Sequence, residues 1–199
     1  SSHTDFAGLW KALNLTSDWQ HGQSQGLFEN EQTDLSSNSA DNRYQLLKNT
    51  LARFTQAKTF GSLIEVQAED AEPLAELLDQ LRQLAREGDV MQKPAAEQLV
   101  PFVQQAWVLA QRYDAVVANP PYMGGKYQTP AVKEFLKDNF SGYEKDLFSA
   151  FIIRNLQLSK EHGQLGFMTP FVWMFISSYK QLRARLIDDG VISTLVQLE

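Results

Sequence analysis

The sequence predicts an α/β fold in which a parallel sheet follows a mainly helical segment. Residues 1–112 carry apolar side chains at helical spacing and show no alternation of strands and helices. Over residues 113–199, short apolar runs alternate with helical stretches, a pattern typical of a parallel sheet. The chain has 199 residues, 43% of them hydrophobic, which is enough for a well-formed core. We therefore expect a helical segment over 1–112 and an α/β domain over 113–199.

Within the helical segment we expect helices over 4–14, 39–58, 71–87 and 94–112. The clearest is 71–87, where leucines recur on one face and Gly88 follows the last turn. Pro101 should break or kink the last of these helices, because proline removes a backbone hydrogen bond. The polar stretch 15–38 is expected to be a loop, and 63–66 a short extended piece.

The α/β part is expected to run as strand 113–119, loop 120–129, helices near 130–138 and 144–161, strand 164–169, helix 178–188 and strand 191–198. The first strand contains Ala115 to Ala118, a short apolar run rich in β-branched residues. Such a run is typical of a parallel strand that is covered on both faces.

The four residues Asn119-Pro120-Pro121-Tyr122 directly follow this first strand. The prolines end the strand, because neither can donate a backbone hydrogen bond. The Asn119 amide oxygen and the Pro120 carbonyl then form two acceptors at the carboxyl end of a strand, the edge where open α/β sheets bind ligands. Two such acceptors can hold both hydrogens of an exocyclic NH2 group and aim its lone pair at an electrophile. The Tyr122 ring offers a flat face to a planar base, such as an extruded adenine.

Charge and composition limit the classes of function. The formal net charge is −6, so this chain alone is expected to bind DNA weakly. There are no cysteines, and no cluster of His or carboxylate residues has metal-ligand spacing, so neither thiolate chemistry nor a metal site is expected. No apolar run reaches transmembrane length and no signal peptide opens the chain. We therefore expect no membrane contact and a cytoplasmic location.

Three segments of the sequence resemble adenine-N6-specific DNA methyltransferases of the NPPY class. Asn119 to Tyr122 is similar to their motif IV, Glu144 to Phe151 to the segment after it, and Gly163 to Pro170 to their next core strand. The longer string Asn-Pro-Pro-Tyr-Met-Gly-Gly-Lys, with Phe60-Gly61-Ser62-Leu63-Ile64 upstream, resembles the PglX methyltransferases of phage-growth-limitation and BREX defence systems. The resemblance is strongest over about 113–199.

This resemblance implies a partial Rossmann-like sheet. It also implies an enzyme that transfers a methyl group from S-adenosylmethionine to adenine in double-stranded DNA. It also implies a role in host-DNA modification and phage defence, with other defence-system proteins as further partners. The implied catalytic residues are Asn119, Pro120 and Tyr122. The implied substrate contacts are Pro121, Phe171, Trp173 and Lys126, and Asp146 would lie near the cofactor.

A glycine-rich turn is needed in such folds to bind the cofactor, and no G-x-G sequence occurs in this chain. We therefore expect the chain to be an internal fragment that holds the target-base half of the site. Its main S-adenosylmethionine motif would lie outside it, and the fragment alone would be inactive.

Other interpretations of the same residues stay open. Methylation of a glutamine amide in a protein, or of RNA, uses the same Asn-Pro-Pro-Tyr chemistry. A non-catalytic helical interaction module would use the helices of 1–112, with the motif as an ordinary Pro-Pro turn. Plain structural roles are a solvated turn for Lys126, helix capping for Asp146 and burial for Phe171 and Trp173.

Overall fold

The computed structural model describes residues 6–15, 35–189 and 191–196, except for the side chains of 35–41. The described chain forms two compact units. The helical unit takes in residues up to 57 together with 64–111, and the sheet unit takes in residues 58–63 and those from 112 onward. Within the described ranges, no helix is long and apolar enough to cross a membrane.

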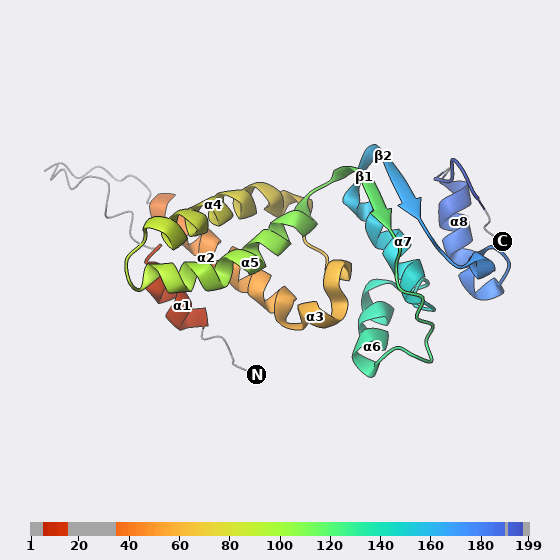
Figure 1. The fold of residues 1–199 in the computed structure, drawn as a ribbon, viewed down its shortest axis with the longest axis horizontal. Coiled ribbons are helices and arrows are strands. Elements are labelled where there is room, and N and C mark those ends of the chain that lie inside the picture. The colour runs from red at the N-terminus through yellow and green to blue at the C-terminus, as the bar shows by residue number, and fades with distance from the viewer. Residues whose placement is uncertain (1–5, 16–34, 190, 197–199) are drawn as a thin grey trace, which may run out of the picture. The chain divides into compact units, whose positions relative to one another are not determined.

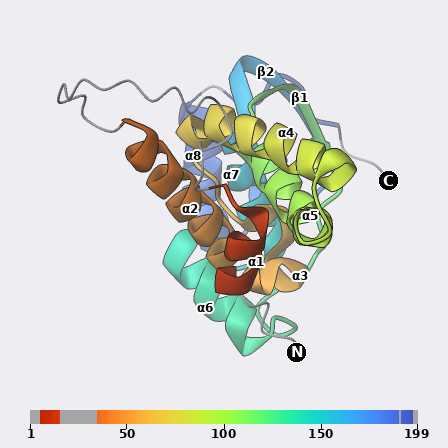
Figure 2. The ribbon, with the colours of Figure 1, turned by 90° about the vertical axis from the view of Figure 1, so that its left-hand side faces the viewer.

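The helical unit contains α1 (Phe6–Leu13), α2 (Leu35–Arg53), α4 (Ala71–Glu87) and α5 (Gln92–Ala110). Short 3-10 turns lie at Phe54–Gln56 and Ala68–Asp70. α4 packs along α5 (Figure 1), and α1 and α2 also lie against α5 (Figure 2). Four leucines of α4 are buried: Leu74, Leu77, Leu78 and Leu81. The predicted helix over 71–87 is thereby confirmed, and the Gly88 amide closes its last turn on the Leu84 carbonyl.

Pro101 does not break the helix that contains it. α5 runs without interruption from Gln92 to Ala110, so the expected break is wrong. Proline removes only its own bond to the Glu97 carbonyl, and both residues lie on the exposed side of the helix, where water can take the freed acceptor. Leu99 and Val103 lie buried on the other side. Burying each such side chain contributes about 2 kcal/mol, which offsets the cost of about 3 kcal/mol for the proline.

The sheet unit contains β1 (Tyr113–Ala118), α6 (Pro130–Asn139), α7 (Leu147–Leu158), β2 (Ser159–Phe167) and α8 (Lys180–Asp188). Its 3-10 turns lie at Phe171–Met174 and Ser177–Tyr179. β1 and β2 pair in parallel, and their arrows point the same way in Figure 1. The predicted parallel pairing is confirmed, and what the described residues form is a two-stranded sheet.

β2 is regular only in its second half. The register shifts between the pair Tyr113–Ser159 and the pair Ala115–Gln164, and pairing is regular from Gln164 to Phe167. Gly163 lies in the irregular part, where an added Cβ would be 3.0 Å from the carbonyls of Lys160 and Tyr113. The expected strand start at 164 therefore matches the regular part of the ladder, although the strand as a whole begins at Ser159.

The expectation that β1 is covered on both faces is wrong. Val117 is 85% exposed, and Ala115, two residues earlier on the same face, is exposed as well. Val116 and Ala118 alternate with them and are half-buried. α7 packs against both strands, so one face of the sheet has a covering helix and the other is open among the described residues.

Two other predicted boundaries differ from the structure. α7 begins at Leu147 rather than 144, because Asp146 caps it, and it ends at Leu158 rather than 161. Residues 191–196 form no strand, although one was expected over 191–198. Within the described residues, the sheet consists of β1 and β2 alone, and residues 191–196 do not extend it.

Most of the remaining predicted elements are confirmed within a few residues. Helices 4–14, 94–112, 130–138 and 178–188 correspond to α1, α5, α6 and a 3-10 turn followed by α8. The expected helix 39–58 corresponds to α2 and the turn after it, and α2 begins four residues earlier than expected, at Leu35. Of the expected extended piece 63–66, Leu63 ends a 3-10 turn and the rest is irregular. The expected loop 15–38 lies mostly outside the described residues.

α7 is the centre of the sheet unit, because it contributes to two apolar clusters. Leu147 and Ala150 belong to one cluster, and Phe148 and Ile152 belong to the other. The end of α3 (Ala57–Phe60) and the 3-10 turn after it pack on the first cluster. The Phe60 ring stacks on Phe135 with centroids 4.0 Å apart, and Leu63 is buried.

Candidate functional site

Asn119 and Pro120 lie where the parallel ladder ends. The Met168 amide donates to the Ala118 carbonyl at 3.3 Å, and the next two residues leave the sheet. Asn119 is exposed and Pro120 is buried. None of the described residues donates a hydrogen bond to the Pro120 carbonyl. The two expected acceptors are therefore both present at the carboxyl end of β1.

Tyr122 lies against Asn119 and against the start of α7. Its hydroxyl donates to Asn119 Oδ1 at 3.3 Å. Its ring meets the Phe148 ring edge-on, with centroids 6.4 Å apart and an interplanar angle of 89°. The side chain is still 53% exposed, so much of the ring remains accessible to a planar ligand. Phe148, which the sequence favours as a core residue, is buried and also supports this ring.

The loop after the motif is tied to the residues before α7 by backbone pairing. Asp146 Oδ1 accepts hydrogen bonds from the Met123 amide at 2.8 Å and from the Phe148 amide at 3.3 Å. Gly124 and Asp146 form an isolated antiparallel bridge, and the Gly125 amide donates to the Lys145 carbonyl at 3.2 Å. One carboxylate thus caps α7 and fixes the loop that carries the motif. Helix capping was the structural role expected of it.

Gln128 is a further residue of this loop, and no sequence pattern singles it out. Its side chain is buried, and Nε2 donates to the Met123 carbonyl at 3.0 Å and to the Glu144 carbonyl at 3.5 Å. It therefore bridges the two segments that Asp146 also joins. A polar residue in a predicted loop is normally solvated, so only the tertiary contacts reveal this role.

Burial raises the pKa of Asp146 above its ordinary value, although the amides of Met123, Phe148 and Leu147 act in the opposite direction. Burial also raises the pKa of Tyr179, and the nearby Asp146 carboxylate raises it further. The Tyr179 ring packs against Phe148 at 5.4 Å. The region behind Tyr122 is therefore a partly desolvated environment around one carboxylate.

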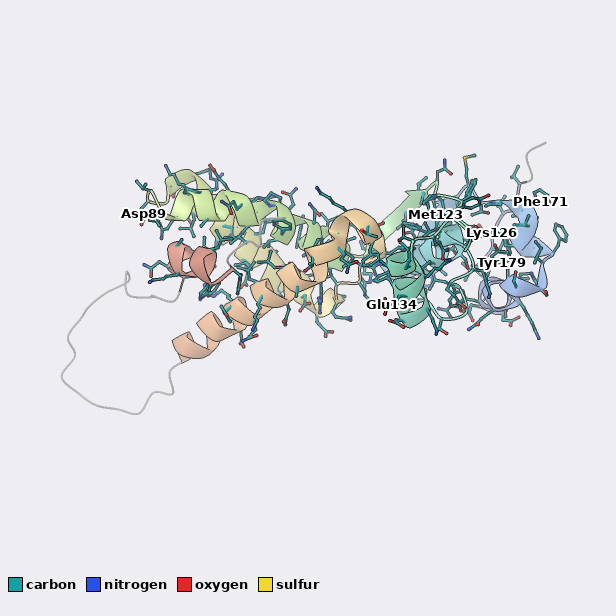
Figure 3. The ribbon with its side chains drawn as sticks, turned by 90° about the horizontal axis from the view of Figure 1, so that it is seen from below. Asp89, Met123, Lys126, Glu134, Phe171 and Tyr179 are labelled. Atoms are coloured by element: carbon teal, nitrogen blue, oxygen red, sulfur yellow. The ribbon has the colours of Figure 1, made fainter. Side chains whose placement is uncertain are left out.

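The other predicted site residues lie in different surroundings. Trp173 is buried in the cluster of Phe148 and Tyr179, and its indole N–H donates to Thr169 Oγ1 at 3.2 Å. Phe171 is 57% exposed and meets Phe175 in a T-shaped contact. Lys126 is exposed on the loop after the motif. Figure 3 shows Phe171 in a different part of the sheet unit from Met123, which begins that loop.

The arrangement of Asn119, Pro120 and Tyr122 suits a planar molecule with an exocyclic amino group. Asn119 Oδ1 has two lone pairs, so it can keep the Tyr122 hydroxyl and also accept from an amino group. The free Pro120 carbonyl supplies a second acceptor, and the exposed ring supplies a stacking face.

Comparison with known proteins identifies relatives that are named as adenine-specific methyltransferases. The profile of the Eco57I restriction-modification methylase family matches residues 27–199. The chain is 46% identical, over 197 residues, to the adenine-specific methyltransferase BrxX of Escherichia coli O9:H4 (strain HS), covering 99% of this chain and 16% of that protein. It is 28% identical over 152 residues to the adenine-specific methyltransferase PglX of Lacticaseibacillus casei (strain Zhang), covering 74% and 12%.

A third relative is the type II restriction enzyme and methyltransferase RM.Eco57I of Escherichia coli, 32% identical over 90 residues, which cover 43% of this chain and 9% of that protein. The resemblance predicted from Asn119 to Tyr122 and the segments after it is confirmed by these matches. The chain spans less than a fifth of the length of each of these relatives.

Proposed function

Since this chain belongs to the Eco57I restriction-modification methylase family, we propose that it forms the target-base part of a DNA adenine-N6 methyltransferase. The observation that carries the proposal is the pair of acceptors at the end of β1, Asn119 Oδ1 and the Pro120 carbonyl, beside the exposed Tyr122 ring. The names of BrxX and PglX support adenine over a glutamine amide as the substrate.

In this proposal the two acceptors each take one N–H of the adenine amino group. The N6 lone pair is then drawn out of conjugation with the ring and points away from the acceptors. Tyr122 stacks on the extruded base, and Pro121 keeps the turn rigid beneath it. Because the amine acts through its lone pair, these residues supply position and polarisation rather than a strong base. The N6 proton leaves to solvent after transfer.

The residues present fit the base half of such a site better than the cofactor half. The chain has no G-x-G turn, so in this proposal the main cofactor motif lies elsewhere in a longer protein. Bound S-adenosylmethionine would supply an electrophilic methyl group. Asp146 would act near it mainly by positioning, because its Oδ1 already accepts from the Met123 and Phe148 amides.

We also propose that β1 and β2 are part of a larger Rossmann-like sheet. The parallel pairing of β1 and β2, with α7 packed against both strands, supports this, because parallel sheets are typically built from such strand–helix–strand units. The helical segment 1–112 would then precede the target-base half, 113–199, of a catalytic domain. Such an enzyme would work in the cytoplasm on double-stranded DNA, together with other proteins of a defence system.

The remaining substrate contacts differ in how well the surroundings support them. Phe171 and Lys126 are exposed and free to meet DNA. Trp173 is buried, so in this proposal it shapes the turn after β2 rather than touching the base.

The proposal is tested by sequencing-based detection of N6-methyladenine in cells with and without the whole gene. We expect methylation at one DNA motif to vanish on deletion and to return with the intact gene. Unchanged adenine methylation, together with loss of methyl groups from a protein glutamine or from RNA, would instead support the alternative substrates.

A further inference from the structure

A cavity of about 430 Å³ lies between the turn before α7 and the first turns of α8. It is lined by Gly142, Glu144, Lys145, Ser177, Ser178, Lys180, Gln181 and Ala184. Of these residues, only Glu144 and Lys145 also contact the candidate site, and they do so through their backbone carbonyls. We refer to this cavity as the lysine groove.

The two walls of the lysine groove meet at Gly142 and Gln181. Gly142 has φ +89°, and an added Cβ there would lie 1.9 Å from Gln181 Oε1. Its amide donates to the Glu144 carboxylate, which closes the turn. The positive φ favours a glycine here, and the Gln181 side chain lies directly over it. The cavity is thus bounded by a defined tertiary contact.

The residues that line the lysine groove have a net positive charge and include two serines. Lys145 and Lys180 lie on opposite walls, and neither forms an ion pair with another residue that the structure describes. Ser177 and Ser178 add two hydroxyl groups. The carboxylate on the rim, Glu144, is bonded to the Gly142 amide. A hollow lined by two lysines and two serines suits a phosphate group, for which lysine acts as a point charge.

Both walls of the lysine groove connect directly to the candidate site. On one wall, the Lys145 carbonyl accepts from Gly125, three residues after Tyr122. On the other wall, Tyr179 lies between Ser178 and Lys180 and packs on Phe148, whose ring supports Tyr122. Figure 3 shows Lys126 and Tyr179 on the same unit as Met123.

We propose that the lysine groove binds a backbone phosphate of the same DNA whose adenine is held by Asn119 and Tyr122. The inference rests on the proposed function and adds to it a subsite that would fix the strand while the base is extruded. Phosphate contacts position the strand and carry no sequence information. Lys145 and Lys180 would therefore affect all DNA sequences alike.

The first test measures DNA affinity by fluorescence anisotropy at several KCl concentrations, in the full-length protein that contains this chain. The double variant Lys145→Gln/Lys180→Gln should lower the slope of log Kd against log[KCl] by about 1 and weaken binding about tenfold. The matched control is Lys133→Gln/Lys137→Gln, which removes two exposed charges from α6. Equal slopes for wild type and the groove variant, or an equal change in the control, would overturn the proposal.

The second test locates the phosphate with DNA that carries a single neutral methylphosphonate at successive positions around the target adenine. At one position the methylphosphonate should weaken wild-type binding about tenfold and leave the groove variant unaffected, because the variant has already lost that contact. Independent effects at every position would contradict the proposal.

Failure of this inference can be told apart from failure of the proposed function. If the wild-type protein methylates adenine but no methylphosphonate position couples to Lys145 and Lys180, the groove alone is refuted. If the wild-type protein methylates no adenine, the proposed function itself fails.

Discussion

Two hydrogen bonds at single residues determine how the motif is presented. The Tyr122 hydroxyl donates to Asn119 Oδ1, and the Asp146 carboxylate accepts from the Met123 amide. The first links the Asn119 and Tyr122 side chains to each other, and the second links the loop after the motif to the start of α7. The position of this loop therefore depends on a carboxylate 23 positions away in sequence.

The ring face of Tyr122, rather than its hydroxyl, should account for most of the contribution of this residue to kcat/KM. Stacking a base on an aromatic ring contributes roughly 1–3 kcal/mol, so in the full-length protein Tyr122→Ala should lower kcat/KM about 5- to 150-fold. Tyr122→Phe should retain most activity, because Asn119 Oδ1 is exposed and water can replace the lost donor. Steady-state methylation kinetics on a DNA duplex measure both variants.

A mismatch opposite the target adenine provides the control for Tyr122, because it lowers the energy needed for extrusion. If Tyr122→Ala is equally impaired in binding normal DNA, mismatched DNA and DNA that lacks the target base, the ring does not stack on an extruded base.

The raised pKa of Asp146 predicts a pH dependence of folding stability. Burial lifts the folded-state pKa above 3.8, so the folded state holds the proton more tightly than the unfolded state. The stability of the wild type should therefore fall relative to Asp146→Asn as pH rises above 3.8, and the difference should level off once the buried carboxyl is ionised. Urea unfolding of the wild type and of Asp146→Asn at several pH values measures this difference in stability. A difference of opposite sign would show that the Met123 and Phe148 amides outweigh burial.

Among the secondary-structure elements, α7 links the most parts of the sheet unit. Its first residues support the motif loop, its middle joins two apolar clusters, and Arg154 holds the turn Gly61–Leu63. Arg154 is fully buried, and its Nε donates to the Ser62 carbonyl at 3.0 Å. Of the five residues from Phe60 to Ile64 that resemble PglX, the first four belong to the sheet unit, and Phe60, Ser62 and Leu63 make the contacts described here.

Arg154→Ala should destabilise the fold by about 3 kcal/mol, because it leaves the Ser62 carbonyl without this donor and opens a cavity. Hydrogen exchange should increase at the amides of Phe60 to Leu63, and urea unfolding should report the loss of stability. Arg86→Ala, at an exposed position of α4, is the matched control and should change stability by less than about 0.5 kcal/mol. Equal effects of the two changes would contradict the role of Arg154.

The elements that were predicted correctly are those whose signals are local. The leucine spacing and Gly88 define α4, and the β-branched run followed by prolines defines β1. Three of the errors depend on what lies next to an element in space. Whether Pro101 breaks α5, whether β1 is covered twice and whether 191–196 forms a strand are decided by neighbours in space, which no local pattern reports.

The same division holds for the candidate site. Asn119 to Tyr122 are consecutive, so the sequence predicts them as a group. The support from Gln128 and Tyr179 arises from contacts across the fold, which no local sequence pattern indicates.

At the scale of the whole molecule, the chain divides into a helical unit and a sheet unit, and the candidate site lies within the second. The net charge of −6 sets a limit on what this chain alone can do with DNA. Lys145 and Lys180 would therefore contribute only a small part of the DNA-binding energy, and most of it would have to come from other parts of a longer protein.

The chain alone should bind S-adenosylmethionine no more tightly than the millimolar range, because it lacks a glycine-rich turn after a strand. Titration calorimetry measures this directly. A micromolar dissociation constant would show that this chain contains a cofactor site after all.

The central claim, that Asn119 holds the amino group of the target adenine, is tested most directly by Asn119→Ala in the full-length protein. Two quantities are measured on the same preparation: the rate of adenine methylation and the affinity for S-adenosylmethionine. Removing one preorganised polar contact at the reacting group should lower the rate by about 100-fold or more and leave cofactor affinity nearly unchanged. Methylation within about threefold of the wild-type rate would contradict the claim, since a single preorganised contact is worth far more than that.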